Sequence, residues 1–315
     1  MEATDFEHQP VLIGEVMQCL QPQGDDFIID CTFGRGGYSA AILQQLDDKG
    51  RVLALDADPD AIAHGERVFE NEPRLVLAHN NYDRIVETLK DLGMPAKADG
   101  IVFDLGVSSP QLDDATRGFS FRNDGPLDMR MNPHVGQSAS EWLNTVSLKD
   151  LARVISTLGE ERVAGRIARR IIEFRDGAVL DSTAQLAEVV YQAMPEKEKR
   201  QRKTHPATKT FQAIRMHVNQ ELEHLSAGLH AALDSLLEGG VLAVVSFHSL
   251  EDRMVKQLFR RSVLGEAVPD RLPLKQADMG GDYEYVEKLV KPTAEETTRN
   301  PRARSARLRA IKRIR

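Results

Sequence analysis

The chain contains little cysteine and no long apolar run. Its 315 residues include two cysteines, Cys19 and Cys31, too few for a disulfide framework or a four-cysteine zinc site. No apolar stretch approaches the roughly 18 residues that span a bilayer. The first residues, Met-Glu-Ala-Thr-Asp-Phe-Glu, lack the basic and apolar regions of a signal peptide. Because scarce cysteine also suits a reducing compartment, we expect a soluble, cytoplasmic protein with no membrane partner.

An overall excess of positive charge is also absent. The formal net charge is −7, so the protein is not a polycation. Positive charge is concentrated locally instead: residues 299–315 hold eight Arg or Lys and no acid, and residues 197–203 form a second basic cluster. Such blocks are typical of solvated surface, and they also mark places where a polyanion docks. Both interpretations stay open at this point.

Short β-branched, apolar segments alternate with helical patterns in the first hundred residues. This alternation is typical of βαβ units and predicts an α/β fold with a mainly parallel sheet. Strand character returns after residue 240. The expected strands are 27–32, 51–56, 75–78, 101–104, 241–248, 284–290 and 305–314, and the first expected helices are 39–46 and 59–69.

Between the fourth and fifth strands the pattern becomes helical. We expect helices at 147–158, 160–175 and 182–195, and a helical region from Pro206 to Gly239-Gly240. The economical prediction is a discontinuous α/β domain, 1–114 and 211–315, interrupted by an all-helical domain at 115–210. A tandem of two domains is the alternative, and it would leave the strand at 241–248 in a separate sheet.

The stretch that follows the fourth strand is unusual. Asp104 ends the strand, and residues 105–131 are rich in Gly, Pro, Ser, Asp and Arg, so we expect a long loop without a helix. Such loops are usually functional or disordered, and the Phe, Leu and Met content here argues against disorder. Open α/β sheets bind ligands at the carboxyl ends of their strands. The pattern therefore predicts a ligand site beside Asp104.

A glycine turn follows the first strand. It reads Asp30-Cys-Thr-Phe-Gly-Arg-Gly-Gly37, and glycines let a ligand approach the backbone closely. Asp56 ends the second strand 19 residues after Gly37, where an acid can accept hydrogen bonds from both ribose hydroxyls. The turn lacks the Gly-x-Gly-x-x-Gly spacing of a pyrophosphate site.

Acids at three strand ends suit a cationic ligand better than a phosphate. Asp30, Asp56 and Asp104 are the three. S-adenosylmethionine carries an adenosine, a sulfonium and an ammonium group, and no phosphate, so we expect it as the cofactor. The competing interpretation is that the acids merely cap turns.

Several long blocks, in order along nearly the whole chain, resemble the bacterial 16S ribosomal RNA cytosine-N4 methyltransferases of the MraW family. The blocks are His8-Gln-Pro-Val-Leu12, Asp30 to Gly37, Asp104 to Met131, Thr204 to Arg215, Val218-Asn-Gln-Glu-Leu222, Ser246 to Arg253 and Asn300 to Ser305. The resemblance implies a class I (Rossmann-like) S-adenosylmethionine-dependent methyltransferase sheet with an inserted helical substrate-recognition domain. It also implies methylation of the exocyclic N4 of a cytidine in the P-site region of 16S rRNA, with the small ribosomal subunit as partner.

Motif positions carried over from this family give the expected cofactor-binding residues: Gly36, Gly37, Tyr38, Asp56, Tyr82, Asp104 and Gln111. We hypothesise that Ser108, Ser109 and backbone carbonyls near Pro110 hold the target amino group. We expect no metal, because no His, Cys and Asp cluster has convincing ligand spacing. A methyltransferase acting on another RNA, a protein or a small molecule is the alternative, and a non-catalytic RNA-binding module is a further one.

Other residues allow two interpretations each. Phe119 and Phe121 either stack on an extruded base or fix the loop onto the core. His248 either touches the target or satisfies a turn, and His205 is interpreted as a helix-start residue. The arginines that share one side of 160–175 (Arg162, Arg166 and Arg169), the 197–203 cluster and the C-terminal arginines are candidate phosphate contacts.

Overall fold

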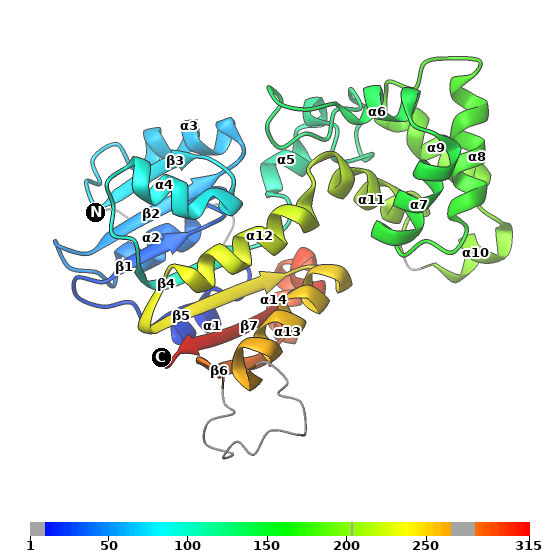
Figure 1. The fold of residues 1–315 in the computed structure, drawn as a ribbon. Helices are drawn as coiled ribbons and strands as arrows, with labels where there is room; N and C mark the ends of the chain where they lie inside the picture. Colours follow the sequence, from blue (N-terminus) through cyan, green and yellow to red (C-terminus); the bar gives the residue numbers. More distant parts are fainter. Residues whose placement is uncertain (1–9, 203, 266–280) are drawn as a thin grey trace. The chain divides into compact units, whose positions relative to one another are not determined.

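The computed structural model describes residues 10–202, 204–265 and 281–315 (Figure 1). The chain divides into two compact units. The sheet unit comprises Met1–Gly106 and Glu223–Arg315, and the helical unit comprises Val107–Leu222. The predicted insertion, 115–210, falls within the helical unit. Lys203 of the basic cluster and the first two residues of the block His8-Gln-Pro-Val-Leu12 lie outside the described residues.

A seven-stranded sheet forms the centre of the sheet unit. Its strand order is β3-β2-β1-β4-β5-β7-β6; β1 to β5 pair in parallel, and β7 runs antiparallel to both β5 and β6. The predicted α/β class and the predicted strands are confirmed. The strands are β1 (Phe27–Asp30), β2 (Arg51–Asp56), β3 (Leu75–His79), β4 (Ala98–Asp104), β5 (Leu236–Ser246), β6 (Tyr283–Val290) and β7 (Arg307–Arg313).

Helices bury both faces of this sheet. One apolar cluster joins the strands to α4, α12 and α13, and a second joins them to α1, α2 and η4. A sheet covered on both faces needs nearly continuous apolar strands, and all four residues of β1 are buried. The helices are α1 (Ile13–Leu20), α2 (Gly37–Leu43), α3 (Pro59–Val68), η1 (Tyr82–Arg84), α4 (Ile85–Asp91), α12 (Glu221–Asp234), α13 (Ser249–Leu264), α14 (Ala294–Arg299) and η4 (Pro301–Ser305).

The helical unit has a core of its own. Apolar residues from α6 to α9 and α11 form one buried cluster. Within the part of the chain that the structure describes, every helix is too short or too polar to cross a membrane. The helices of this unit are α5 (Ser109–Asp113), η2 (Ala115–Arg117), α6 (Ala139–Thr145), α7 (Leu148–Leu158), α8 (Ala164–Arg175), α9 (Thr183–Ala193), α10 (Glu196–Gln201) and α11 (Thr208–Val218).

The predicted helical region from Pro206 to Gly239-Gly240 is wrong in two places. The chain leaves the helix after α11 and re-enters it at α12, with Gln220 between them at a φ of 48°. The glycine pair lies inside β5, at an irregularity where Ala98 pairs with Leu236 and Gly100 pairs with Val241. Glycines tolerate the backbone of a bulge, so this pair marks a distorted strand rather than a helix end.

The predicted helix-free loop after Asp104 is also wrong. Helix α5 begins with a capping box, in which the Ser108 Oγ accepts from the Gln111 N–H at 3.4 Å and the Gln111 Oε1 accepts from the Ser108 N–H at 2.9 Å. Pro110 stands in the first turn. A serine three residues before a glutamine, with a proline at the helix start, is a helix signal that the abundance of loop-forming residues obscured.

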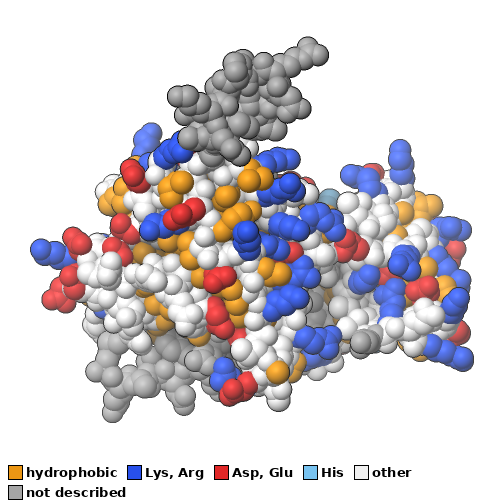
Figure 2. Space-filling view, turned by 90° about the horizontal axis from the view of Figure 1, so that it is seen from below, with side chains coloured by type: hydrophobic (Ala, Val, Ile, Leu, Met, Phe, Trp, Pro, Cys, Tyr) orange, Lys and Arg blue, Asp and Glu red, His pale blue; other side chains and the backbone are white. Residues whose placement is uncertain are grey.

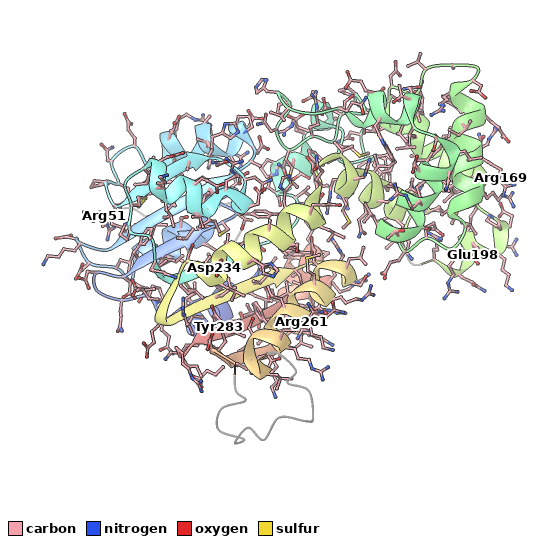
Figure 3. All side chains as sticks on the ribbon, in the orientation of Figure 1. Arg51, Arg169, Glu198, Asp234, Arg261 and Tyr283 are labelled. Carbon is pink, nitrogen blue, oxygen red and sulfur yellow. The ribbon has the colours of Figure 1, made fainter. Side chains whose placement is uncertain are left out.

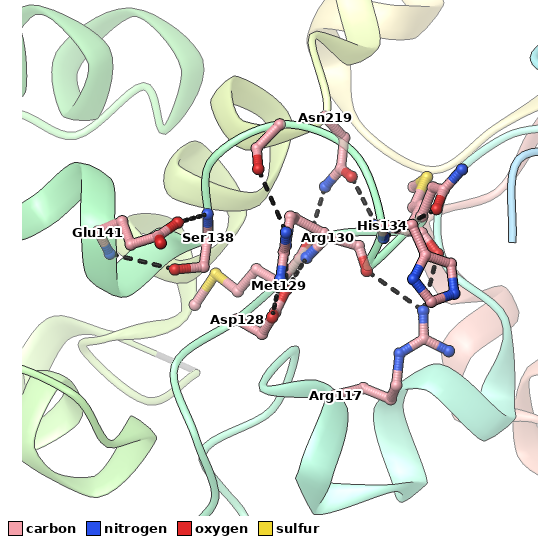
Figure 4. A network of polar contacts seen from close by, with 11 residues as sticks. Arg117, Asp128, Met129, Arg130, His134, Ser138, Glu141 and Asn219 are labelled. Atoms are coloured by element: carbon pink, nitrogen blue, oxygen red, sulfur yellow. Dashed lines mark hydrogen bonds and ion pairs between the residues drawn. The ribbon is translucent and has the colours of Figure 1, made fainter.

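The rest of this stretch is fixed by polar contacts (Figure 4). The Arg117 Nη2 donates to the carbonyls of Arg130 and Met131, at 3.2 and 2.8 Å. Asn219 makes two hydrogen bonds to this stretch. Its Nδ2 donates to the Met129 carbonyl at 2.7 Å, and its Oδ1 accepts from the Met131 N–H at 2.7 Å. These contacts hold the fully buried Met129 at a φ of 63°, a left-handed conformation unusual for this residue.

The two phenylalanines of this stretch pack inward. Phe119 is 5% exposed and belongs to the core of the helical unit. Phe121 packs edge-to-face on Phe211, with ring centroids 4.8 Å apart, and lies 4.7 Å from the ring of His205. The His205 Nδ1 accepts from the Ala207 N–H just before α11. These contacts favour the interpretation that the rings fix the loop onto the core.

Candidate cofactor and target site

Three acids end three neighbouring strands of the sheet unit. Asp30 ends β1, Asp56 ends β2 and Asp104 ends β4. Because β2, β1 and β4 are adjacent and parallel, the three carboxyl groups lie at the same edge of the sheet. This is the edge at which open α/β sheets bind ligands.

Asp30 is fully buried and bonded within the protein. Its Oδ2 accepts from the Ser39 hydroxyl at 2.7 Å, and its Oδ1 accepts from the Thr32 N–H at 3.2 Å. Burial raises the pKa of this carboxyl to about 6, against the lowering effect of those bonds. Asp30 therefore holds the glycine turn against α2.

Asp56 accepts one backbone hydrogen bond on each carboxylate oxygen. The Gly34 N–H donates to Oδ2 at 2.7 Å, and the Asp58 N–H donates to Oδ1 at 2.8 Å. Burial raises its pKa to about 6, and the same two bonds oppose the rise. A carboxylate oxygen has two lone pairs, so each oxygen can still accept a ribose hydroxyl.

Asp104 is the least satisfied of the three acids. Its Oδ1 is buried with no hydrogen-bond partner among the described residues. Burial raises its pKa to about 8, and the negative charges of Asp30 and Glu251 add to the rise. A buried, unpaired acceptor next to two further acids is costly, and a bound cation would remove that cost.

The glycines of the turn serve the protein's own packing. A Cβ on Gly36, which has a φ of 77°, would lie 2.7 Å from the Phe69 ring and 2.8 Å from the Phe33 ring. A Cβ on Gly37 would lie 2.3 Å from the Pro10 ring. Gly34, at a φ of 56°, has nothing closer than 3.9 Å at the same position. Of these three glycines, Gly34 is therefore the one that leaves open space beside its backbone.

The two predicted tyrosines occupy different environments. Tyr38 is buried and its hydroxyl donates to the Val11 carbonyl. Tyr82 follows β3 and packs edge-to-face on Phe103, with ring centroids 5.4 Å apart. Gly228 of α12 makes room for it, because a Cβ there would lie 2.7 Å from the Tyr82 ring. Tyr38 thus anchors the N-terminal segment, and Tyr82 presents a ring at a strand end.

The sequence patterns missed Asn81. Its Oδ1 is buried without a hydrogen-bond partner among the described residues, and it lies at the carboxyl end of β3, next to Tyr82. An asparagine just after a strand is common in turns, so nothing in its spacing distinguished it.

The predicted target residues form the start of α5. Ser108, Ser109 and Pro110 belong to the helical unit, as does Gln111, which was predicted to bind the cofactor. The Pro110 carbonyl accepts from the Asp114 N–H at 2.9 Å, as expected inside a helical turn. Because the Ser108 Oγ accepts in the capping box, its hydroxyl proton can still be donated elsewhere.

Comparison with known proteins gives the family. The model of the MraW methylase family matches residues 5–314. The chain belongs to the MraW methylase family. A protein named ribosomal RNA small subunit methyltransferase H from Nitrosococcus oceani is 50% identical over 96% of this chain and 95% of its own length. Its namesake from Idiomarina loihiensis is 47% identical over 100% of this chain and 99% of its own length.

Similarity to solved structures is weaker. An rRNA methylase from Streptococcus thermophilus aligns over 96% of each chain at 11% identity, with a TM-score of 0.41. The family match confirms the predicted enzyme class, a methyltransferase, and the predicted cofactor, S-adenosylmethionine. The residues of this methylase fit that cofactor, because the unpaired Asp104 Oδ1 and the neighbouring acids favour a cationic ligand.

His248 lies at the same edge of the methylase sheet. It is the N-cap of α13, directly after β5, where its Nδ1 accepts from the Glu251 N–H at 3.5 Å and its Nε2 lies 2.8 Å from the Glu251 Oε1. The Glu251 Oε2 accepts from the Phe247 N–H at 2.9 Å. The Nε2 atom is buried and makes no hydrogen bond to the described residues in spite of this short distance, so both interpretations of His248 stay open.

Proposed function

We propose that this methylase transfers a methyl group from S-adenosylmethionine to the exocyclic N4 of a cytidine in the P-site region of 16S rRNA, on the small ribosomal subunit. The buried Asp104 Oδ1, which has no hydrogen-bond partner among the described residues, supports the cationic cofactor. The relatives' names, ribosomal RNA small subunit methyltransferase H, support the RNA substrate. The exposed cations of the helical unit suit a polyanion.

The sheet unit supplies the cofactor side of the proposed site. Asp56 accepts the ribose hydroxyls on the lone pairs that its two backbone bonds leave over. Tyr82 offers a ring to the adenine, and the unpaired Asn81 Oδ1 accepts from a base amino group. Asp104 pairs with the positive charge of the amino-acid portion. In this proposal Gly36, Gly37 and Tyr38 act by shaping the turn, and Gln111 acts from the start of α5.

The target amine needs orientation more than activation. S-adenosylmethionine, when bound, supplies an electrophilic methyl group on its sulfonium. The lone pair of the cytosine amino group is delocalised into the ring, so the protein must hold that group in line with the methyl carbon. Ser108, Ser109 and carbonyls near Pro110 are the proposed groups that hold it. No strong base is required, because methylation itself makes the amine proton acidic.

The helical unit is the proposed substrate-recognition domain. Arg162, just before α8, and Arg166 and Arg169 on α8 are exposed, and Figure 3 shows Arg169 directed away from the helix bundle. Of these, Arg169 donates from Nε to the Gly165 carbonyl at 3.2 Å and keeps its Nη atoms for other partners. Contacts of this kind with phosphates give affinity without sequence choice.

Methyl mapping tests the proposal. The protein is incubated with labelled S-adenosylmethionine and, separately, small ribosomal subunits, naked 16S RNA and a protein extract. We expect label on one cytidine N4 of 16S rRNA, with subunits a better substrate than naked RNA. Label on protein, on a small molecule or on another RNA would replace the proposed substrate. Cofactor binding without transfer to any of them would indicate a non-catalytic module.

A further inference from the structure

Helix α13 carries a basic stripe that the sequence patterns did not indicate. Arg253, Lys256 and Arg260 are exposed on it, and Arg261 lies beside them. At about 100° per residue, the first three fall within about 60° of one another around the helix. Figure 3 labels Arg261 on this helix. Figure 2 shows Lys and Arg side chains gathered on the face of the molecule seen from below, with acidic side chains scattered among them.

The acids of α13 lie on a different side of the helix from Lys256 and Arg260. The helix has two, and both are buried on its inner side. Glu251 faces His248. Asp252 pairs with Arg307, from Oδ2 to Nη1 at 2.6 Å, and with Arg309, from Oδ1 to Nε at 2.8 Å.

In the strand beneath α13, Glu284 is also turned away from the helix. In β6, Tyr283 and Tyr285 pack against the same apolar cluster as α13, and the intervening Glu284 points to the other side of the strand. Lys256, Arg260 and Arg261 are exposed on the outer side of α13.

Helix α13 begins at the edge of the sheet that carries the three acids. Helix α13 follows β5 after two residues, and Val245 near the end of β5 is in register with Asp104 at the end of β4. Arg253 lies in the first turns of the helix, closest to that edge of the sheet. From Arg253 to Arg260 the helix rises about 10 Å, which spans about three phosphates of one nucleic-acid strand.

We propose that the α13 stripe binds the sugar–phosphate backbone of the RNA strand that carries the target nucleotide, on the sheet unit itself. This inference rests on the proposed rRNA substrate. The stripe holds the strand through phosphates, so it adds affinity at the catalytic unit and leaves the choice of nucleotide to other contacts. It is a second cationic surface, separate in the chain from the arginines of α8.

The test compares two triple variants with equal net charge. K256Q/R260Q/R261Q removes three cations of the stripe and keeps Arg253, and K49Q/R67Q/K90Q removes three exposed cations from the turn before β2, from α3 and from α4 in the same unit. All six side chains are exposed, so both variants should fold, which cofactor binding measured by calorimetry checks. The readouts are affinity for a 16S RNA fragment against salt, and the KM and kcat for small subunits.

In the stripe variant, we expect the slope of log binding constant against log salt concentration to become shallower by about two units. RNA affinity at physiological salt should fall by up to about 50-fold. Its KM should rise, with kcat and cofactor affinity unchanged, and the control should match the wild type. An R260K/R261K variant should retain RNA binding, since it keeps the charge.

Equal RNA affinity and salt slope in the stripe variant and the wild type would overturn the inference. A KM that rises for subunits while affinity for naked RNA is unchanged would also overturn it, because the surface would then contact a protein. Failure of the proposed function is a separate result, namely a wild-type protein that transfers no methyl group to 16S rRNA.

Discussion

The cofactor edge of the sheet unit and the start of α8 in the helical unit use charged residues in opposite ways. In the sheet unit, three acids converge on one edge of a buried sheet, and the Asp104 Oδ1 has no hydrogen-bond partner within the part of the chain that the structure describes. In the helical unit, polar groups of the long stretch are paired, as for Arg117 and Asn219, and the cations of α8 are exposed. A buried acid with an unpaired oxygen favours a small cationic ligand, whereas exposed positive charge favours a long polyanion and responds to salt.

Replacing Asp104 with asparagine should produce the largest effect. The D104N change removes the charge at nearly constant shape, and a hydrogen bond to a charged group contributes about 1.5–3 kcal/mol. We expect cofactor affinity to fall about 100-fold, measured by calorimetry. The exposed Asp91→Asn on α4 is the control and should bind normally. Normal binding by D104N would remove the basis for assigning the sheet unit its cation site.

Replacing the arginines of α8 should have the next largest effect. In R162Q/R166Q/R169Q we expect RNA affinity to fall up to about 50-fold at physiological salt, with a shallower salt dependence and unchanged cofactor affinity. Filter binding against salt measures it, with K49Q/R67Q/K90Q as the control of equal net charge. A salt dependence that stays the same would show that the exposed charge of the helical unit does not contact RNA.

Cofactor binding should depend on pH. Burial raises the pKa of Asp104 to about 8, so without ligand this carboxyl is mostly protonated at pH 7. Because a cation prefers the carboxylate, binding releases a proton, and affinity should rise towards pH 8 by at most about tenfold per pH unit. Calorimetry in buffers of different ionisation enthalpy measures the proton release. Binding that is independent of pH would contradict the assignment.

The same pKa shift affects stability with a definite sign. The folded protein holds the Asp104 proton up to about pH 8, whereas the unfolded chain releases it near pH 4. The unfolded state therefore binds fewer protons between these values, and the free energy of unfolding without ligand falls as pH rises through this window. D104N should lose this part of the pH dependence in thermal melts.

The smallest predicted effect separates helix capping from catalysis. Ser108 and Ser138 both cap helices of the helical unit through capping boxes. Replacing either with alanine should cost about 1 kcal/mol of stability. If Ser108 also holds the target amine, S108A alone should lower kcat, about fivefold, with cofactor affinity unchanged. Equal kcat values in S108A and S138A would leave Ser108 with a capping role only.

The sequence predicted features that depend on local periodicity. Apolar β-branched runs gave the strands, and acids at their ends gave the cofactor edge. Features that depend on a distant partner were not predictable. Nothing near Gly36 indicated that Phe69 fills the space of its missing Cβ, and nothing near Met129 indicated that Asn219 holds its backbone.

Two errors arose from competing signals. The glycine pair 239–240 has the composition of a helix end, yet it bulges within β5 because strand pairing with β4 resumes beyond it. Helix 160–175 was predicted to begin at Glu160, but α8 begins at Ala164 because Glu160 has a φ of 46°. The unpaired state of Asp104 required coordinates, because a sequence does not show which hydrogen bonds are missing.

The insertion of the helical unit between β4 and β5 also affects how the protein is made. Strands β1 to β4, with all three acids, leave the ribosome before the helical unit, and β5 follows it. At synthesis rates of 5–20 residues per second, the open edge of β4 waits roughly 6 to 26 seconds for its partner strand. An unpaired edge strand is a template for pairing with another chain. The time needed to synthesise the helical unit thus sets how long each nascent chain is exposed to misassembly.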